Sequence, residues 1–144
     1  MKEKLFLLAD DDNDDAELFD EALSLISTDV SFKRVDNGYD VLEILDTGTH
    51  IPDIIFLDLN LPEMTGWECL EKIRSNSNYA DIPIIVYTTS SSARDLDKAV
   101  QLGAAGLITK PSTFKKLKTI LQKVIVNMDT NLSETILGIA KEEE

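Results

Sequence analysis

Several short apolar runs of this sequence are closely followed by polar residues that can take part in chemistry. These residues are Asp10, Asp11, Asp58, Thr88 and Lys110. Carboxylates that lie close together do not all ionise readily without a cation, and oxygen ligands without histidine or cysteine favour a hard ion such as Mg²⁺. A carboxylate can also act as a nucleophile and form an acyl phosphate. Brought together, these side chains would suit metal-dependent phosphoryl transfer to a carboxylate.

Phosphoryl transfer requires in-line positioning and neutralisation of the equatorial phosphoryl oxygens. A metal ion can neutralise one oxygen, the Lys110 ammonium a second, and the Thr88 hydroxyl or a backbone N–H group a third. Taken singly these residues are ordinary, because an Asp after a strand usually forms a turn and a lone lysine usually lies at the surface. The functional interpretation therefore depends on their occurring together at the ends of strands.

The elements that must position these residues alternate along the chain. Short apolar runs predict strands at Leu5–Ala9, Phe32–Val35, Ile54–Leu57, Ile84–Tyr87 and Gly106–Ile108. Stretches with apolar residues every three or four positions predict helices at Asp15–Ile26, Tyr39–Leu45, Trp67–Ile73, Ala93–Leu102 and Phe114–Val126. The alternation predicts an α/β fold with a doubly wound parallel sheet, in which sites form at the carboxyl ends of the strands.

Length and composition set further bounds. The chain has 144 residues, which is the size of one ordinary domain. Its formal net charge of −13 disfavours nucleic acid and anionic membrane surfaces as partners. The single cysteine, Cys69, excludes an intrachain disulfide and is expected to be half buried in a helix. The apolar run Leu5–Ala9 is too short for a signal peptide or a membrane span, so we expect a cytoplasmic chain.

Four motifs occur in order along the chain. They are Leu-Leu-Ala-Asp-Asp, Phe-Leu-Asp-Leu-Asn-Leu-Pro-Glu-Met-Thr-Gly, Ile-Val-Tyr-Thr-Thr and Gly-Ala-Ala-Gly-Leu-Ile-Thr-Lys-Pro. With these motifs the chain resembles the receiver domain of two-component response regulators, and the resemblance runs from Lys4 to Met128. It implies a flavodoxin-like (βα)5 three-layer sandwich with strand order 2-1-3-4-5.

The resemblance also implies roles for the residues. Asp58 would accept a phosphoryl group from a phosphohistidine on a sensor histidine kinase or a phosphotransfer protein. Asp10 and Asp11 would bind Mg²⁺ together with Asp58 and the backbone carbonyl of Asn60. The run of three aspartates leaves the register open by spacing alone; the family pattern selects the first two and leaves Asp12 as a cap of the following helix, with Asp14 and Asp15 in its first turn.

Thr88 and Lys110 would contact the phosphoryl group, and the Lys110–Pro111 bond is often cis in such domains. The chain departs from the family pattern at Leu107, where a Tyr or Phe usually transmits the signal. Phosphorylation chemistry should survive this change. The change bears instead on the coupling from Thr88 to the surface formed by the fourth helix, the fifth strand and the fifth helix.

We expect a receiver domain over residues 1–128 that signals through protein contacts, with a downstream target or by forming a homodimer through that surface. The sequence around Asp58 is similar to regulators that partner with phytochrome-type kinases. We do not expect an enzyme beyond self-phosphorylation from small donors and autodephosphorylation. The alternatives are an Mg²⁺-dependent aspartyl-phosphate phosphohydrolase, which Asn60 disfavours because its amide cannot act as the acid or base, and a receiver-like module that accepts no phosphate.

Residues 129–144 form an acidic C-terminal segment. Apolar residues at Ile136, Leu137 and Ala140 permit a short helix over Ser133–Ala140 that docks on the domain. The charged Lys-Glu-Glu-Glu ending favours instead a frayed, solvated tail, which is the interpretation we prefer from the sequence.

Overall fold

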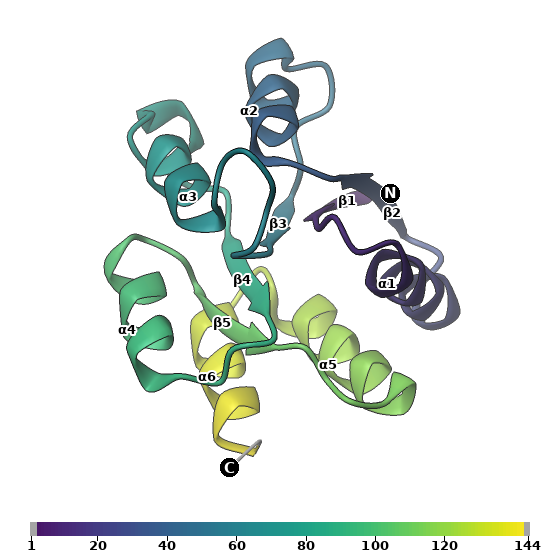
Figure 1. Ribbon diagram of the computed structural model, residues 1–144. Coiled ribbons are helices and arrows are strands. Elements are labelled where there is room, and N and C mark those ends of the chain that lie inside the picture. Colours follow the sequence, from purple (N-terminus) through teal and green to yellow (C-terminus); the bar gives the residue numbers. More distant parts are fainter. Residues whose placement is uncertain (1–2, 143–144) are drawn as a thin grey trace.

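The structure is a computed structural model that describes residues 3–142 (Figure 1). Its centre is a sheet of five parallel strands in the order β2-β1-β3-β4-β5. The strands are β1 (Lys4–Ala9), β2 (Val30–Val35), β3 (Ile54–Leu57), β4 (Ile84–Thr88) and β5 (Gly106–Thr109). The predicted α/β fold and its strand order are confirmed, and no strand end differs by more than two residues from its predicted position.

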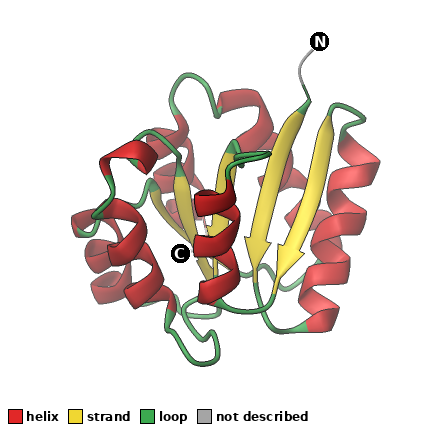
Figure 2. Ribbon diagram, turned by 90° about the horizontal axis from the view of Figure 1, so that it is seen from above, coloured by secondary structure: helices red, strands yellow, loops and turns green. Residues whose placement is uncertain are grey.

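Helices cover both faces of the sheet. They are α1 (Asn13–Ile26), α2 (Gly38–Thr47), α3 (Gly66–Arg74), α4 (Ala93–Gln101), α5 (Phe114–Asn127), α6 (Leu132–Glu142) and a short 3₁₀ helix, η1 (Ser77–Tyr79), which we did not predict. The helices α1 and α5 lie on one face and α2, α3 and α4 on the other, which gives three layers (Figures 1 and 2). Within the described residues, no helix is both long and apolar enough to span a membrane.

The central strands contribute alternate residues to two different apolar cores. In β1, Phe6 and Leu8 belong to the core beneath α1 and α5, whereas Leu7 and Ala9 belong to the core beneath α2, α3 and α4. The strand β3 divides its residues in the same way. Because both faces are buried, these strands are apolar almost throughout, which is why the sequence showed continuous apolar runs rather than alternation.

The hydrogen-bond ladder of the sheet continues one residue past three of its strands. These bonds run from Asp10 N to Val35 O at 3.0 Å, from Asp58 N to Ala9 O at 3.0 Å, and from Lys110 N to Thr88 O at 2.7 Å. Continued alternation then directs the side chains of Asp10, Asp58 and Lys110 to the same face, that of α1 and α5. The sheet itself thus holds three candidate residues in register.

The last described segment is a docked helix, so our preferred interpretation of a solvated tail is wrong. The side chains of Leu132, Ile136 and Ile139 are buried, because their spacing of three and four residues gives α6 an apolar stripe. Through this stripe α6 packs on β5, which is an edge strand of the sheet. The end of the predicted acidic tail, residues 143–144, lies outside the described residues, and the division at residue 128 stays a prediction.

Cys69 is completely buried rather than half buried, because α3 packs its apolar side fully into the core beneath α2. Burial raises the pKa of the Cys69 thiol to about 12.

Since the thiolate is the reactive form, we expect Cys69 to resist a thiol reagent at pH 8 in the folded protein. Labelling should be at least about a thousandfold slower than in denaturant, because it requires the core to open. The rate of modification, followed by absorbance with and without urea, checks this. Equal rates in both conditions would show that the thiol is exposed.

Candidate functional site

One buried ammonium group lies among the carboxylates that follow β1 and β3. Lys110 Nζ lies 2.9 Å from Asp10 Oδ2 and 3.0 Å from Asp58 Oδ2. The side chains of Asp10 and Asp58 are almost wholly inaccessible to solvent, and that of Lys110 is 11% exposed. The three residues come from the carboxyl ends of three strands, which is where the fold was expected to form its site.

The two buried carboxylates are held in the same way. Asp10 Oδ1 accepts a hydrogen bond from Asp12 N at 3.0 Å, and Asp58 Oδ1 accepts one from Asn60 N at 3.1 Å. Each carboxylate therefore has one oxygen fixed by the backbone and the other turned toward Lys110. Their orientation is set before any ligand arrives, so little reorganisation is needed at the moment of reaction.

The Asp10 carboxylate retains capacity for a cation. Burial raises the pKa of Asp10 to about 6, although the Asp12 hydrogen bond and Lys110 act in the opposite direction. Asp10 Oδ2 lies near the ammonium, but within residues 3–142 it accepts no hydrogen bond of acceptable geometry. A buried oxygen of this kind is typically satisfied by an ion or water that the protein binds.

Asp11 completes a set of acidic ligands. One carboxylate oxygen from each of Asp10, Asp11 and Asp58 lies within 4.8 Å of the others. Asp11 is exposed, so this side of the cluster is open to solvent and to a phosphoryl donor. Three carboxylates with an open side suit a hard divalent cation that keeps some of its waters. The residues present therefore fit the metal that the sequence predicted.

Asp12 takes the other role predicted for it. Its side chain accepts a hydrogen bond from Asp15 N at 3.0 Å and caps the start of α1. Asp14 and Asp15 lie in the first turn, as expected. The structure thus places Asp12 outside the carboxylate cluster, although the assignment of the metal ligands stays a prediction.

Lys110 has a third carboxylate partner that we did not predict. Asp15 Oδ2, from the first turn of α1, lies 2.8 Å from Lys110 Nζ. Burial would lower the pKa of Lys110, but its close contacts with the carboxylates of Asp15, Asp10 and Asp58 outweigh burial, so the pKa is raised and the ammonium stays charged. The ammonium also lies 5.6 Å from the centre of the Tyr87 ring. The sequence indicated Asp15 only as a first-turn residue of the helix and gave no signal for its contact with Lys110.

Thr88 ends β4 and is 1% exposed. Its Oγ1 accepts a long hydrogen bond from Ser90 N at 3.5 Å. The expectation of a cis bond between Lys110 and Pro111 is wrong, because that bond is trans, the form that X–Pro bonds ordinarily favour. Asn60 is exposed in the loop that follows Asp58.

Arg34, a residue of β2, holds the loop that follows β1 but does not contact the carboxylate cluster with its own charge. Arg34 Nε, from β2, donates to the backbone oxygen of Asp10 at 3.0 Å, and its Nη1 donates to Asn13 Oδ1 at 2.7 Å. Arg34 therefore fixes the loop that carries the two candidate metal ligands from β1. We assigned nothing to β2 from the sequence, because its contribution comes from within the strand and not from its end.

The family model described as the response regulator receiver domain matches residues 6–122. The chain belongs to this family. Chemotaxis protein CheY1 of Helicobacter pylori is 32% identical over 96 residues, which are 67% of this chain and 77% of that protein. The sensor histidine kinase CheAY of the same organism is 27% identical over 121 residues, which are 84% of this chain but 15% of that protein. This receiver thus spans a small part of one of its relatives.

Two solved response regulators have the same fold as this receiver. The Mn²⁺-bound form of Rcp1 matches with a TM-score of 0.77 and 28% identity, covering 87% of this chain and 94% of that chain. The phosphorylated cyanobacterial phytochrome response regulator RcpA matches with a TM-score of 0.79 and 28% identity, covering 88% of this chain and 96% of that chain. Receiver domains are signalling proteins that interact with histidine kinases or phosphotransfer proteins.

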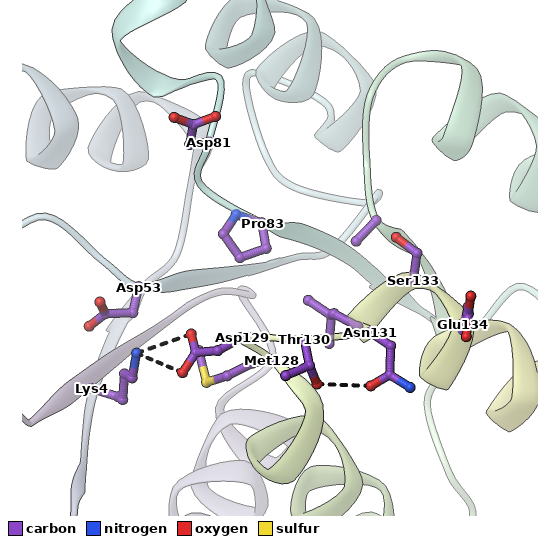
Figure 3. Close-up of a pocket in the computed structure, with 12 residues that line it drawn as sticks. Lys4, Asp53, Asp81, Pro83, Met128, Asp129, Thr130, Asn131, Ser133 and Glu134 are labelled. Atoms are coloured by element: carbon purple, nitrogen blue, oxygen red, sulfur yellow. Dashed lines mark hydrogen bonds and ion pairs between the residues drawn. The ribbon is translucent and has the colours of Figure 1, made fainter.

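The receiver also has a pocket of about 580 Å³ at the opposite edge of the sheet (Figure 3). It is lined by residues at the amino ends of the strands and by the first turn of α6, and Lys4 pairs there with Asp129 at 3.2 Å. The lining mixes apolar, neutral polar and charged residues, four of them acidic, and nothing in it points to a ligand. The candidate side chains of the predicted site gather at the carboxyl edge instead.

The metal assignment can be tested by two neighbouring substitutions. We expect Asp11→Ala to weaken Mg²⁺ binding by at least about tenfold, because it removes a carboxylate from the cluster. Asp12→Ala should leave Mg²⁺ binding nearly unchanged and instead cost about 1 kcal/mol of stability by removing the cap of α1. Calorimetry or Trp67 fluorescence during Mg²⁺ titration measures the binding, and urea unfolding measures the stability. The reverse order of metal affinities would show that the ligand register is wrong.

The new partner of Lys110 gives a second test. We expect Asp15→Asn to raise the rate of phosphorylation by a small donor about two- to fivefold, since a part-exposed ion pair is worth under about 1 kcal/mol and its loss frees the ammonium for phosphoryl oxygens. Asp14→Asn removes the same charge from the same turn and is the control. Equal acceleration in both variants would mean that general charge, and not the contact with Lys110, sets the rate.

Proposed function

We propose that this receiver accepts a phosphoryl group on the Asp58 carboxylate from a phosphohistidine of a sensor histidine kinase or phosphotransfer protein. The observation that carries the proposal is the pairing of the buried Asp58 Oδ2 with the Lys110 ammonium at 3.0 Å, within an acidic cluster that fits a metal ion. A carboxylate so placed can act as a nucleophile, and a fixed cation lies where negative charge arrives.

Mg²⁺ would be held by Asp10, Asp11 and Asp58 and by the backbone carbonyl of Asn60. When bound, it would neutralise charge on the phosphoryl oxygens, so that the negatively charged donor phosphoryl group can approach the Asp58 carboxylate. The Mn²⁺-bound form of Rcp1, 28% identical to this chain, supports a divalent metal in this fold.

The chain's own residues carry the transfer. A carboxylate oxygen of Asp58 forms a bond to phosphorus while the phosphorus–nitrogen bond of the donor histidine breaks, and the imidazole leaves with the bonding electrons and takes up a proton. Lys110, already charged and held by Asp15, neutralises the transferred oxygens. The Thr88 hydroxyl donates to another phosphoryl oxygen after it turns away from Ser90. Later attack by water returns Asp58 to its free form.

The signal then leaves through protein contacts. RcpA, a phosphorylated phytochrome response regulator 28% identical to this chain, supports a phytochrome-type kinase as the donor. We place the exchange in the cytoplasm, in keeping with the composition of the chain and its single cysteine.

Acetyl phosphate with Mg²⁺ tests the proposal without knowledge of the cognate kinase. Intact-mass measurement should show one phosphoryl adduct per chain, and omission of Mg²⁺ with a chelator should abolish it. A wild-type chain that gains no adduct in the presence of Mg²⁺ would refute the proposed function. Rapid turnover of unrelated phosphate esters would favour the phosphohydrolase instead.

A further inference from the structure

The chain covers one of its own candidate interaction surfaces. The helix α6 lies against β5 and α5, and the side chain of Ile136 is wholly buried there. The fit depends on Gly106, since a Cβ at that residue would lie 2.7 Å from Ile136 Cγ2. The fourth helix, fifth strand and fifth helix are the elements through which we expected partners or a second copy to dock. In this structure α6 occupies the β5 and α5 part of that surface.

Near its C-terminal end, α6 borders a cavity as well as the core. The helix buries the side chains of Leu132, Ile136 and Ile139 against the core. Its last part borders a cavity of about 330 Å³ whose lining includes Ala140, Leu107 and Thr109 together with the loop from β4 to α4. The helix begins beside the pocket at the amino edge of the sheet (Figure 3) and ends beside the cavity at the carboxyl edge, the edge at which Asp58 lies. The end of α6 that borders this cavity is therefore the end nearer the site.

Ser90 connects this cavity to the site. Its N–H group donates to Thr88 Oγ1 over a long 3.5 Å, its backbone oxygen accepts from Thr109 Oγ1 at 2.9 Å, and its Oγ donates to Asp95 Oδ2 at 2.6 Å. Ser91 and Ser92, which follow it, are exposed and line the cavity. A turn of the Thr88 hydroxyl toward a phosphoryl group would break the long bond from Ser90 N. Ser91 and Ser92, which line the cavity, would then be free to move.

We propose that α6 is the resident occupant of the surface formed by β5 and α5, and that phosphorylation of Asp58 loosens α6 and uncovers this surface. The inference rests on the proposed function. As the segment from Thr88 to Ser92 moves toward Asp58, Ser91 and Ser92 withdraw from the cavity that also borders Ala140. The last part of α6 is then less supported on that side. The cavity lies beside Leu107, the position at which receiver domains usually have the Tyr or Phe that transmits the signal. In this chain α6 takes over that transmission.

Hydrogen exchange on the full chain tests this coupling. The chain is treated with acetyl phosphate and Mg²⁺, the adduct is counted by intact mass, and amide exchange is read over residues 132–142 of the same sample. We expect exchange there to rise by about tenfold or more in the phosphorylated chain, as for a segment that opens locally, and to stay unchanged in Asp58→Asn. An adduct without faster exchange overturns this inference and leaves the proposed function intact. Absence of an adduct overturns both.

Two variants test the same coupling in reverse, because energetic coupling between sites is reciprocal. Gly106→Ala and Ile136→Ser should both displace α6, whereas Leu137→Ser, at a residue 46% exposed on the same helix, is the matched control. We expect the two displacing variants to bind beryllium fluoride with Mg²⁺, a mimic of the phosphoryl group, several-fold more tightly than the wild type, and the control to bind it equally. Equal affinity in a folded Gly106→Ala variant overturns the inference. Agreement between two substitutions on opposite sides of the contact supports it.

Discussion

Replacement of Asp58 by Asn is expected to abolish the phosphoryl adduct that the wild-type chain gains from acetyl phosphate and Mg²⁺. The amide keeps the size of the side chain and can still accept a hydrogen bond from Asn60 N, so the loop after β3 should be preserved. It lacks the nucleophilic carboxylate, however, and it removes one of the three acidic ligands of the cluster. Intact-mass measurement on both proteins gives the result directly.

The matched control is Asp36→Asn. Asp36 follows β2 as Asp58 follows β3, but it is exposed and lies outside the cluster. It should gain the adduct as the wild type does. The adduct should also be labile in mild alkali, as an acyl phosphate is and a phosphoserine is not. An adduct that survives in Asp58→Asn, for example on Ser90, would show that the acceptor is misassigned.

Replacement of Lys110 by Met is expected to have two large effects. Phosphorylation should slow by roughly 10²- to 10³-fold, the usual cost of losing one donor that stabilises transferred charge. The free energy of unfolding at pH 7 without Mg²⁺ should fall by about 3 kcal/mol, because the buried Asp10 loses its counter-charge while its carboxylate stays in place. Urea unfolding and phosphorylation kinetics measure the two effects.

Mg²⁺ should restore much of the lost stability, since it binds the folded chain and replaces the missing positive charge. Lys115→Met, at an exposed residue near the start of α5, removes the same charge from a neighbouring region and should change neither quantity by much. Unchanged stability of Lys110→Met without metal would mean that the ammonium does not hold the carboxylates together.

The positions of Asp10, Asp58 and Lys110 could be predicted because each depends on a short-range rule. The end of an apolar run marks the end of a strand, and the carboxyl ends of parallel strands lie at one edge of the sheet. The alternation of side chains along a strand then determines the face to which each residue points. The helices and the parallel sheet followed from the alternation of apolar runs and amphipathic stretches, whereas the strand order was implied by the resemblance to receiver domains. The cap at Asp12 is also a local interaction, but spacing left three aspartates open and the family pattern was needed to select it.

What could not be predicted depends on tertiary contacts. The pairing of Asp15 with Lys110 joins residues from the first helix and the end of the last strand, and no local pattern records it. The docking of α6 was open for the same reason. Of the apolar residues named from the sequence, Leu137 is 46% exposed, and the contact of Ile136 depends on the bare backbone of Gly106, which shows in the sequence only as a glycine. Complete burial of Cys69 likewise depends on how closely α3 approaches α2.

The backbone bonds that tie Asp10, Asp58 and Lys110 to their neighbouring strands have a consequence for how such a domain can change over evolutionary time. An insertion of one residue within β1 or β3 would shift the carboxylate along the ladder and turn it to the opposite face of the sheet. An insertion in the connections at the far edge would leave the ladder as it is, and long surface connections cost little. Length variation in descendants of this gene should therefore concentrate in loops, while the strands that precede the acidic residues keep their number of residues.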